Sequence, residues 1–116
     1  MKILVVDDDK NGSELAEIYL KEAGYEVTTT QACQKVLENI DAERFDLVIM
    51  DIDMPGSDTF DLLCSINEKC PELRVMIHTG FDDHKDIEKW KERAAAFMVK
   101  SSDMEKFVKQ VKGVLA

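Results

Sequence analysis

Aspartates follow two short apolar runs of the chain, at the point where each run ends. They are Asp7, Asp8 and Asp9 after the first run, and Asp51 and Asp53 after the second. Carboxylate oxygens with no His or Cys among them suit Mg²⁺ better than Zn²⁺. Without a cation, carboxylates held close together repel one another and raise one another's pKa. The two groups therefore predict a magnesium site if the fold brings them together.

Two other apolar runs, at 75–77 and 97–99, are followed by side chains that can donate hydrogen bonds to a phosphoryl group. These side chains are Thr79 and Lys100. A lysine and a hydroxyl suit phosphoryl oxygens, and an aspartate between a divalent cation and a lysine is a plausible nucleophile toward phosphorus. The positive charges would offset the repulsion between two anions, and positioning would supply most of the rate. The residue types therefore indicate phosphoryl chemistry on an aspartate.

The elements that must position these side chains alternate along the chain. Short, nearly unbroken apolar runs predict parallel strands covered on both faces, at 3–6, 47–50, 75–77 and 97–99. Alternating residues predict a half-exposed edge strand at 25–29. Helical periodicity lies between the strands, at 12–23, 31–41, 58–69, 83–94 and 103–115. Strict alternation favours an α/β fold with helices on both faces of a parallel sheet and right-handed crossovers.

With five strands, we expect the flavodoxin-like (βα)5 sandwich with strand order 2-1-3-4-5. Parallel strands place their carboxyl ends at one edge of the sheet, so all the residues named above would meet there. Asp9 is expected to cap the helix that follows it. His78 precedes Thr79 in its strand and should point away from the site, because strand side chains alternate. Trp90 lies on the apolar stripe of its helix and is expected in the core.

Two helices carry more detailed expectations. The apolar residues of the first helix predict its buried face: Leu15, Ile18, Tyr19 and Ala23. The last helix is preceded by Ser102, and Glu105 follows three residues later, which is the pattern of a capping box.

The chain resembles the receiver domain of two-component response regulators, of the chemotaxis-receiver type, over its full length. Four stretches carry the resemblance: Ile3-Leu4-Val5-Val6-Asp7-Asp8-Asp9, Asp46-Leu47-Val48-Ile49-Met50-Asp51-Ile52-Asp53-Met54-Pro55-Gly56, Val75-Met76-Ile77-His78-Thr79-Gly80 and Phe97-Met98-Val99-Lys100. All four in this order and spacing are highly specific. The resemblance implies that residues 1–116 form one receiver domain.

The resemblance also implies a role for each site residue. Asp51 would accept the phosphoryl group. Mg²⁺ would be held by Asp8 and Asp51 directly, by Asp7 through water and by the backbone carbonyl of Asp53. Thr79 and Lys100 would contact the phosphoryl oxygens. Phe97 would be the aromatic residue that switches position, and, because it lacks a hydroxyl, we expect nothing polar to hold it in either position.

The implied function is a signalling switch. A histidine kinase or phosphotransfer protein would donate the phosphoryl group, and the domain would catalyse only its own phosphotransfer and slow self-dephosphorylation. A downstream effector would read the state from the surface formed by 83–94, 97–99 and 103–115. No output domain follows the last predicted helix, so we expect output through a partner protein if the chain is complete.

Two departures from the family pattern leave alternatives open. Thr59 stands where a glycine is usual, and Ser101 stands where a proline follows the lysine. A cis bond before a non-proline residue costs about 3–4 kcal/mol, so we expect the Lys100–Ser101 bond to be trans. One alternative is a receiver-like module that binds without being phosphorylated. The other is a phosphatase of the haloacid dehalogenase type that uses Asp51 and Asp53, although that family has its D-x-D motif after the first strand.

Composition excludes several other classes. The 116 residues suit one domain, and no apolar run approaches the ~20 residues of a membrane helix. The short N-terminal run lacks the features of a signal peptide, so a cytoplasmic protein is expected. A net charge of −9 argues against direct binding to nucleic acid. Three cysteines without a C-x-x-C pair favour reduced thiols.

Overall fold

A computed structural model describes residues 1–80 and 87–116. Five strands form one parallel sheet in the order β2-β1-β3-β4-β5. Their bounds are β1 Lys2–Val6, β2 Glu26–Thr30, β3 Leu47–Met50, β4 Arg74–Thr79 and β5 Ala96–Val99. The predicted flavodoxin-like strand order is therefore confirmed, with the alternating segment β2 at one edge of the sheet.

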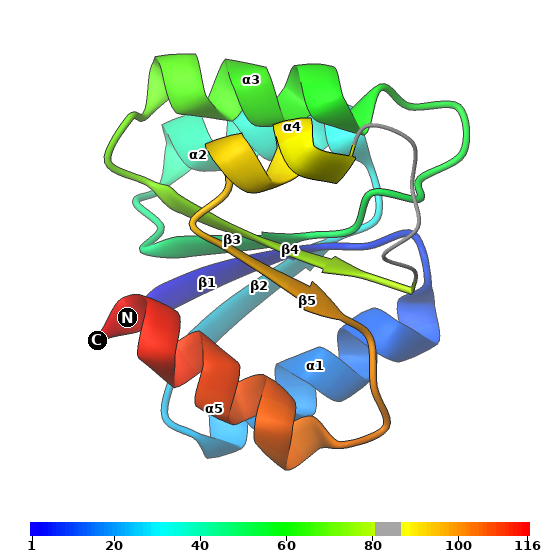
Figure 1. The fold of residues 1–116 in the computed structure, drawn as a ribbon. Helices are drawn as coiled ribbons and strands as arrows, with labels where there is room; N and C mark the ends of the chain where they lie inside the picture. The colour runs from blue at the N-terminus through cyan, green and yellow to red at the C-terminus, as the bar shows by residue number, and fades with distance from the viewer. Residues whose placement is uncertain (81–86) are drawn as a thin grey trace.

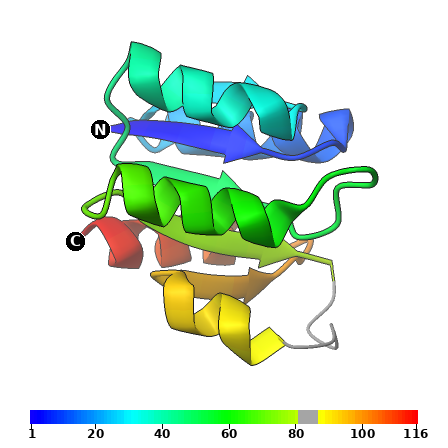
Figure 2. The same ribbon diagram turned by 90° about the horizontal axis from the view of Figure 1, so that it is seen from above.

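Helices cover both faces of the sheet (Figures 1 and 2). Their bounds are α1 Lys10–Glu22, α2 Val36–Ala42 with a 3-10 turn at Cys33–Lys35 before it, α3 Thr59–Lys69, α4 Ile87–Arg93 and α5 Met104–Leu115. Helices α1 and α5 lie on one face, and α2, α3 and α4 lie on the other. The expected start of the fourth helix, at residue 83, lies outside the described residues. Within the described ranges, no helix has the length and apolar character needed to cross a bilayer.

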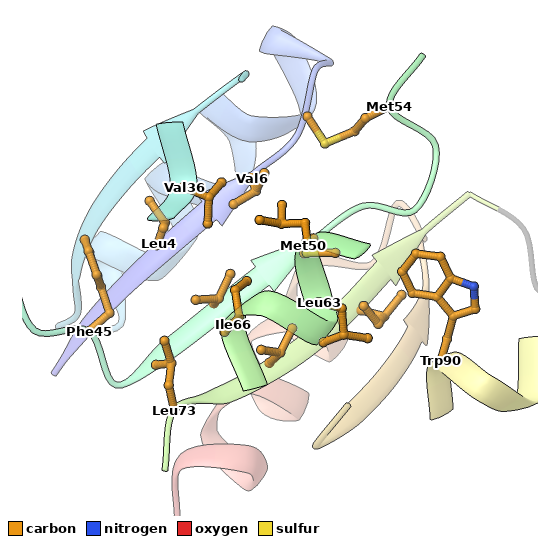
Figure 3. Close-up of a cluster of buried hydrophobic side chains, with 14 residues drawn as sticks. Leu4, Val6, Val36, Phe45, Met50, Met54, Leu63, Ile66, Leu73 and Trp90 are labelled. Atoms are coloured by element: carbon orange, nitrogen blue, oxygen red, sulfur yellow. The ribbon is translucent and has the colours of Figure 1, made fainter. Parts of the chain in front are cut away.

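The alternation of strand side chains divides the core into two layers. Leu4 and Val6 of β1 face the layer under α2, α3 and α4, whereas Ile3 and Val5 face the layer over α1 and α5. Figure 3 shows the first layer, in which side chains of the strands meet those of α2 and α3. Trp90 lies in this layer with 5% of its surface exposed, which confirms its predicted core position.

The predicted buried face of α1 is wrong at two positions. The buried residues are Ser13, Ala16 and Leu20, whereas Leu15 and Ile18 are 44% and 53% exposed. The buried face contains the small side chains of Ser13 and Ala16 together with the fully buried Leu20, which follow one another at helical spacing. The helix is therefore rotated relative to the face that its largest apolar residues indicated.

The predicted cap of α5 is one residue out of position. The side chain of Asp103 accepts a hydrogen bond from the backbone N–H of Lys106 at 3.0 Å, so Asp103 is the N-cap instead of Ser102. Aspartate caps helices as well as serine does, and its negative charge also interacts favourably with the partial positive charge at the helix N-terminus. The hydroxyl of Ser101 accepts from the N–H of Asp103 at 3.1 Å, which fixes the loop that enters the helix.

Candidate functional site

The carboxyl ends of β1 and β3 place Asp7 and Asp51 side by side. Val6 pairs with Met50 in the parallel register, so the two aspartates that follow this pair lie at the same edge of the sheet. Their backbones continue the ladder, because the N–H of Asp7 donates to the carbonyl of Thr30 and that of Asp51 to the carbonyl of Val6, both at 3.1 Å. The backbone thus holds both carboxylates before any ligand binds.

Three aspartates converge at this edge. Asp7, Asp8 and Asp51 each offer one carboxylate oxygen, and these oxygens lie within 4.8 Å of one another. Asp7 and Asp51 are each 6% exposed, while Asp8 is open to solvent. Asp9 points elsewhere and caps α1 by accepting from the N–H of Asn11 at 3.1 Å, as predicted. The geometry therefore separates the three candidate ligands from the capping residue.

Lys100 bridges the two buried carboxylates. Its Nζ lies 2.7 Å from Oδ2 of Asp7 and 2.9 Å from Oδ2 of Asp51. Burial opposes the charge on Lys100, but its hydrogen bonds to both carboxylates outweigh that effect and hold its pKa above the ordinary value. Burial raises the pKa of Asp7, although Lys100 and the N–H of Asp9 oppose the rise. The two buried carboxylates of Asp7 and Asp51 therefore share the ammonium group of Lys100.

The loop after β5 brings Lys100 to this position without a cis peptide. The described residues contain no cis bond, so the Lys100–Ser101 bond is trans, as predicted. The N–H of Lys100 donates to the carbonyl of Thr79 at 2.6 Å, which ties the end of β5 to the end of β4. Serine in place of proline therefore does not prevent the amine from reaching Asp51.

Thr79, the last residue of β4, and Phe97, within β5, each make a contact that the sequence did not indicate. The hydroxyl of Thr79, fully buried, donates to Oδ2 of Asp53 at 3.3 Å. Phe97 is half-buried against the core layer under α4, and Nζ of Lys91 lies 5.3 Å from the centre of its ring. The expectation that nothing polar holds Phe97 is therefore wrong, because a cation over a ring face is attracted to it.

Thr59 has a structural role that sequence reasoning missed. It is the first residue of α3, buried, and its hydroxyl donates to the carbonyl of Ile52 at 2.8 Å. Asp58 caps the same helix by accepting from the N–H of Asp61. The hydroxyl ties the helix to the segment that follows Asp51, so the threonine holds the loop where a glycine is usual. The only sign of this role in the sequence was that Thr59, a residue with a hydroxyl group, stands in a polar segment.

The donor set fits Mg²⁺. The three convergent groups are all carboxylates, which are hard oxygen ligands, and two of them are buried and share the ammonium group of Lys100. Asp53 adjoins the cluster, and its N–H donates to Oδ1 of Asp51 at 3.0 Å. The Asp51-x-Asp53 pair follows the third strand, whereas a dehalogenase-type phosphatase would have it after the first, so the fold does not support that alternative.

Comparison with known proteins agrees with this geometry. The family model of the response regulator receiver domain matches residues 3–112. The chain is 38% identical over 91 residues, 77% of its length, to the two-component response regulator ARR12 of Arabidopsis thaliana. It is 36% identical over 85 residues, 73% of its length, to the regulatory protein VanR of Enterococcus faecium. The chain spans 15% and 36% of the lengths of these two relatives.

Solved structures have the same fold. The response regulator TrrA of Thermotoga maritima, in complex with Mg²⁺-BeF, superposes with a TM-score of 0.88 at 32% identity, covering 98% of both chains. TrrA in complex with the histidine kinase ThkA gives a TM-score of 0.86 at 32% identity, covering 99% of this chain and 98% of the other. The chain belongs to the receiver-domain family of two-component response regulators.

Proposed function

We propose that this receiver domain takes a phosphoryl group on Asp51 and passes the resulting state to a protein partner. The observation that carries the proposal is the position of the Asp51 carboxylate. It is 6% exposed, lies 2.9 Å from the amine of Lys100 and shares a cluster with Asp7 and Asp8. A buried carboxylate between an ammonium group and a cation-binding cluster is a nucleophile poised for an anionic electrophile.

Asp8 and Asp51 would hold Mg²⁺ directly, with Asp7 acting through water and Asp53 through its backbone carbonyl. When bound, the ion would neutralise the charge that builds up between the carboxylates and the phosphoryl oxygens. The N–H of Asp53 fixes the Asp51 carboxylate by donating to Oδ1 at 3.0 Å. Lys100 would then move from its two carboxylate contacts to a phosphoryl oxygen. The Thr79 hydroxyl would also contact the phosphoryl oxygens.

In the transfer step, an Asp51 oxygen attacks the phosphorus of the donor. A phosphorus–oxygen bond forms as the bond from phosphorus to the donor breaks, and the donor leaves with that electron pair. The product is an acyl phosphate on Asp51. Before transfer Lys100 is protonated, because its hydrogen bonds to Asp7 and Asp51 outweigh burial and raise its pKa above the ordinary value, and the anionic phosphoryl oxygens would then replace these partners. The domain thereby catalyses its own modification and does not turn over a separate substrate.

The partners follow from the same proposal. The structural relative TrrA forms a complex with a histidine kinase, so a histidine kinase or phosphotransfer protein is the expected donor. Output would pass through α4, β5 and α5 to an effector protein. Thr79 would leave Asp53 for the phosphoryl group, and Phe97 would turn into the space beside it. The two departures from the family pattern, Thr59 and Ser101, leave the site intact, because Thr59 bonds to the loop after Asp51 and Lys100 still reaches Asp51. An intact site supports this function over a module that only binds.

Phosphorylation of the intact chain tests the proposal. With Mg²⁺ and acetyl phosphate, the mass of the parent should rise by one phosphoryl group. Asp51→Asn keeps the shape of the side chain but removes the nucleophilic oxygen, so it should remain unlabelled. Asp58→Asn is the matched control, because it makes the same change at an exposed helix cap and should be labelled like the parent. Labelling of Asp51→Asn would refute the assignment.

A further inference from the structure

His78 lies on the opposite face of the sheet from the residues that the proposed switch uses. Its neighbour Ile77 packs under α4 with Phe97, whereas Met76, two residues before His78, packs in the layer of α1 and α5. The His78 ring stacks on Phe107 of α5, with ring centres 4.7 Å apart and planes at 25°. Phe107 is 1% exposed and lies on the buried face of that helix. His78 therefore connects β4 with the centre of α5.

A small cavity separates His78 from the proposed phosphorylation site. It has a volume of about 90 Å³, is partly open to solvent and is lined by apolar residues of β1, β3, α1 and α5, by Gly12, and by the polar residues Asp7, Asp51, His78, Lys100 and Ser101. Nε2 of His78 is buried and makes no hydrogen bond to any described protein atom. Leaving a buried polar atom without a hydrogen bond is unfavourable, which makes a water partner for Nε2 the expected arrangement. A cavity with several polar groups in its wall and this volume has room for more than one water molecule.

We propose that ordered water in this cavity joins Nε2 of His78 to the charged groups around Asp51, making His78 a positioning residue that transmits occupancy of the site to α5. The inference rests on the proposed phosphorylation of Asp51 and adds a second path to it. The path of Thr79 and Phe97 runs on the face of α4. The path of His78 and Phe107 runs on the face of α1 and α5.

The signal along this path would begin with a change in the charged groups that line the cavity. Lys100 now contacts both Asp7 and Asp51. When a phosphoryl group occupies Asp51, Lys100 must turn toward the new anion, and the polar wall of the cavity changes with it. Water bonded to that wall would reorient, and its bond to Nε2 would draw or release the imidazole ring. Because the ring stacks on Phe107, the shift reaches the buried face of α5 directly.

Two substitutions separate the hydrogen bond from the ring. His78→Phe keeps an aromatic ring to stack on Phe107 but removes the nitrogen. His78→Gln keeps a group that can bond to water but removes the ring. The probe is beryllofluoride with Mg²⁺, the combination bound in the structural relative TrrA. The readout is the change in backbone amide NMR shifts of α5 at 104–111, compared with the change at Phe97 in the same sample.

In the parent, beryllofluoride should shift both groups of amides. In His78→Phe, the shift changes along α5 should fall by at least half while those at Phe97 remain. In His78→Gln the α5 response should also fall, because no ring remains to stack on Phe107. A full α5 response in either variant would overturn the inference. A high-resolution crystal structure of the parent is the second test, and density without a water molecule bonded to Nε2 would also overturn it.

The failure of this inference can be told apart from failure of the proposed function. A parent chain that shows no shift anywhere with beryllofluoride and Mg²⁺, and no labelling with acetyl phosphate, contradicts the phosphorylation site itself. A parent that responds at both Phe97 and α5, together with a His78→Phe variant that responds equally, contradicts only the role of His78.

Discussion

Lys100 holds two carboxylates that would otherwise repel each other. Its amine lies 2.7 Å from Asp7 and 2.9 Å from Asp51, and the two carboxylates are buried while the lysine side chain is 29% exposed. This arrangement keeps the site compact in the absence of other ligands, but it leaves the lysine engaged with the carboxylates instead of free for a phosphoryl group. If Asp51 is phosphorylated as proposed, new bonds of Lys100 to the phosphoryl group would replace its existing ones, and the net gain would be smaller than the new contact alone would give.

His78 gives the stability of the domain a dependence on pH. Burial, reinforced by the charge of Lys100 and opposed by that of Asp51, lowers the pKa of His78 from 6.5 to about 4. The unfolded chain therefore binds a proton at higher pH than the folded chain does. Stability from this residue is complete above about pH 6.5 and is lost as the pH falls toward 4. Between pH 7.5 and pH 5 the loss is about 2 kcal/mol.

Urea unfolding of the parent and of His78→Phe at pH 7.5 and pH 5 measures this effect. The phenylalanine variant cannot be protonated, so its loss of stability over the same interval should be smaller by about 2 kcal/mol. Contributions from the carboxylates cancel in the comparison because both chains carry them. Equal losses in the two chains would show that the folded protein accepts a proton on His78 as readily as the unfolded one.

At the residue scale, the sequence predicted which residues meet but not all of their contacts. Asp7, Asp8, Asp51 and Lys100 could be placed together because each follows a strand of a parallel sheet. The bond from Thr59 to Ile52 and the contact of Lys91 with Phe97 could not be predicted. Both depend on side-chain directions at loop and helix positions, which periodicity does not fix. The roles assigned to these residues remain predictions.

At the scale of elements, the orientation of a helix follows from how closely it can pack. The apolar pattern of α1 indicated Leu15 and Ile18 as the buried face, but Ser13 and Ala16 face the sheet. The buried stripe runs through Ser13, Ala16 and the fully buried Leu20, so the large apolar residues Leu15 and Ile18 fall outside it. In α5 no such conflict exists: of its apolar residues, Met104, Phe107, Val111 and Leu115 are buried and Val108 is half-buried.

Helix α4 contacts the proposed switch residue through one lysine. Lys91 lies over Phe97, and two residues earlier Lys89 lies 4.3 Å from the ring centre of Phe60. A cation over an aromatic ring at an exposed site contributes about 0.5–1 kcal/mol. If Phe97 turns inward on phosphorylation, that contact is lost and opposes activation. Lys91→Met should therefore tighten beryllofluoride binding in the presence of Mg²⁺ by about two- to fivefold.

Lys89→Met is the matched control, since it removes the same charge and the same kind of contact from the same helix. Its affinity for beryllofluoride should stay within error of the parent's, and titration followed by the NMR shift of Phe97 gives both values. Equal tightening in the two variants would assign the effect to the overall charge of α4. No tightening in Lys91→Met would mean that Phe97 keeps its contact with the helix in both states.

At the scale of the whole molecule, the strand order could be predicted because strict alternation of strands and helices leaves few topologies. The order β2-β1-β3-β4-β5 then brings residues from the beginning and the end of the chain to one edge. Lys100 and Asp7 touch there although 93 positions separate them. The site therefore forms only when the entire domain is folded, so a ligand that binds the site should stabilise the whole domain.

Magnesium should stabilise the entire fold by linkage, because it binds the assembled carboxylates and not the unfolded chain. At ten times the dissociation constant the gain is about 1.4 kcal/mol, or roughly 6 °C in melting temperature for a domain of this size. Asp8→Ala should abolish the gain, since it removes a proposed direct ligand. It should also leave the metal-free protein at least as stable as the parent, because one repelling carboxylate has gone.

Glu22→Ala controls for the loss of one negative charge, because Glu22 lies at the far end of α1, about 18 Å along the helix from its start beside the site. Its melting temperature should rise with Mg²⁺ as the parent's does. Thermal scans with and without Mg²⁺ on the three chains decide between a specific site and general screening. Screening would stabilise all three alike, since the net charge of −9 is reduced by one unit in either variant. A specific site stabilises the parent and Glu22→Ala only, and a parent that melts at the same temperature up to tens of millimolar Mg²⁺ (roughly the weak end of divalent sites) would contradict the proposed ligands.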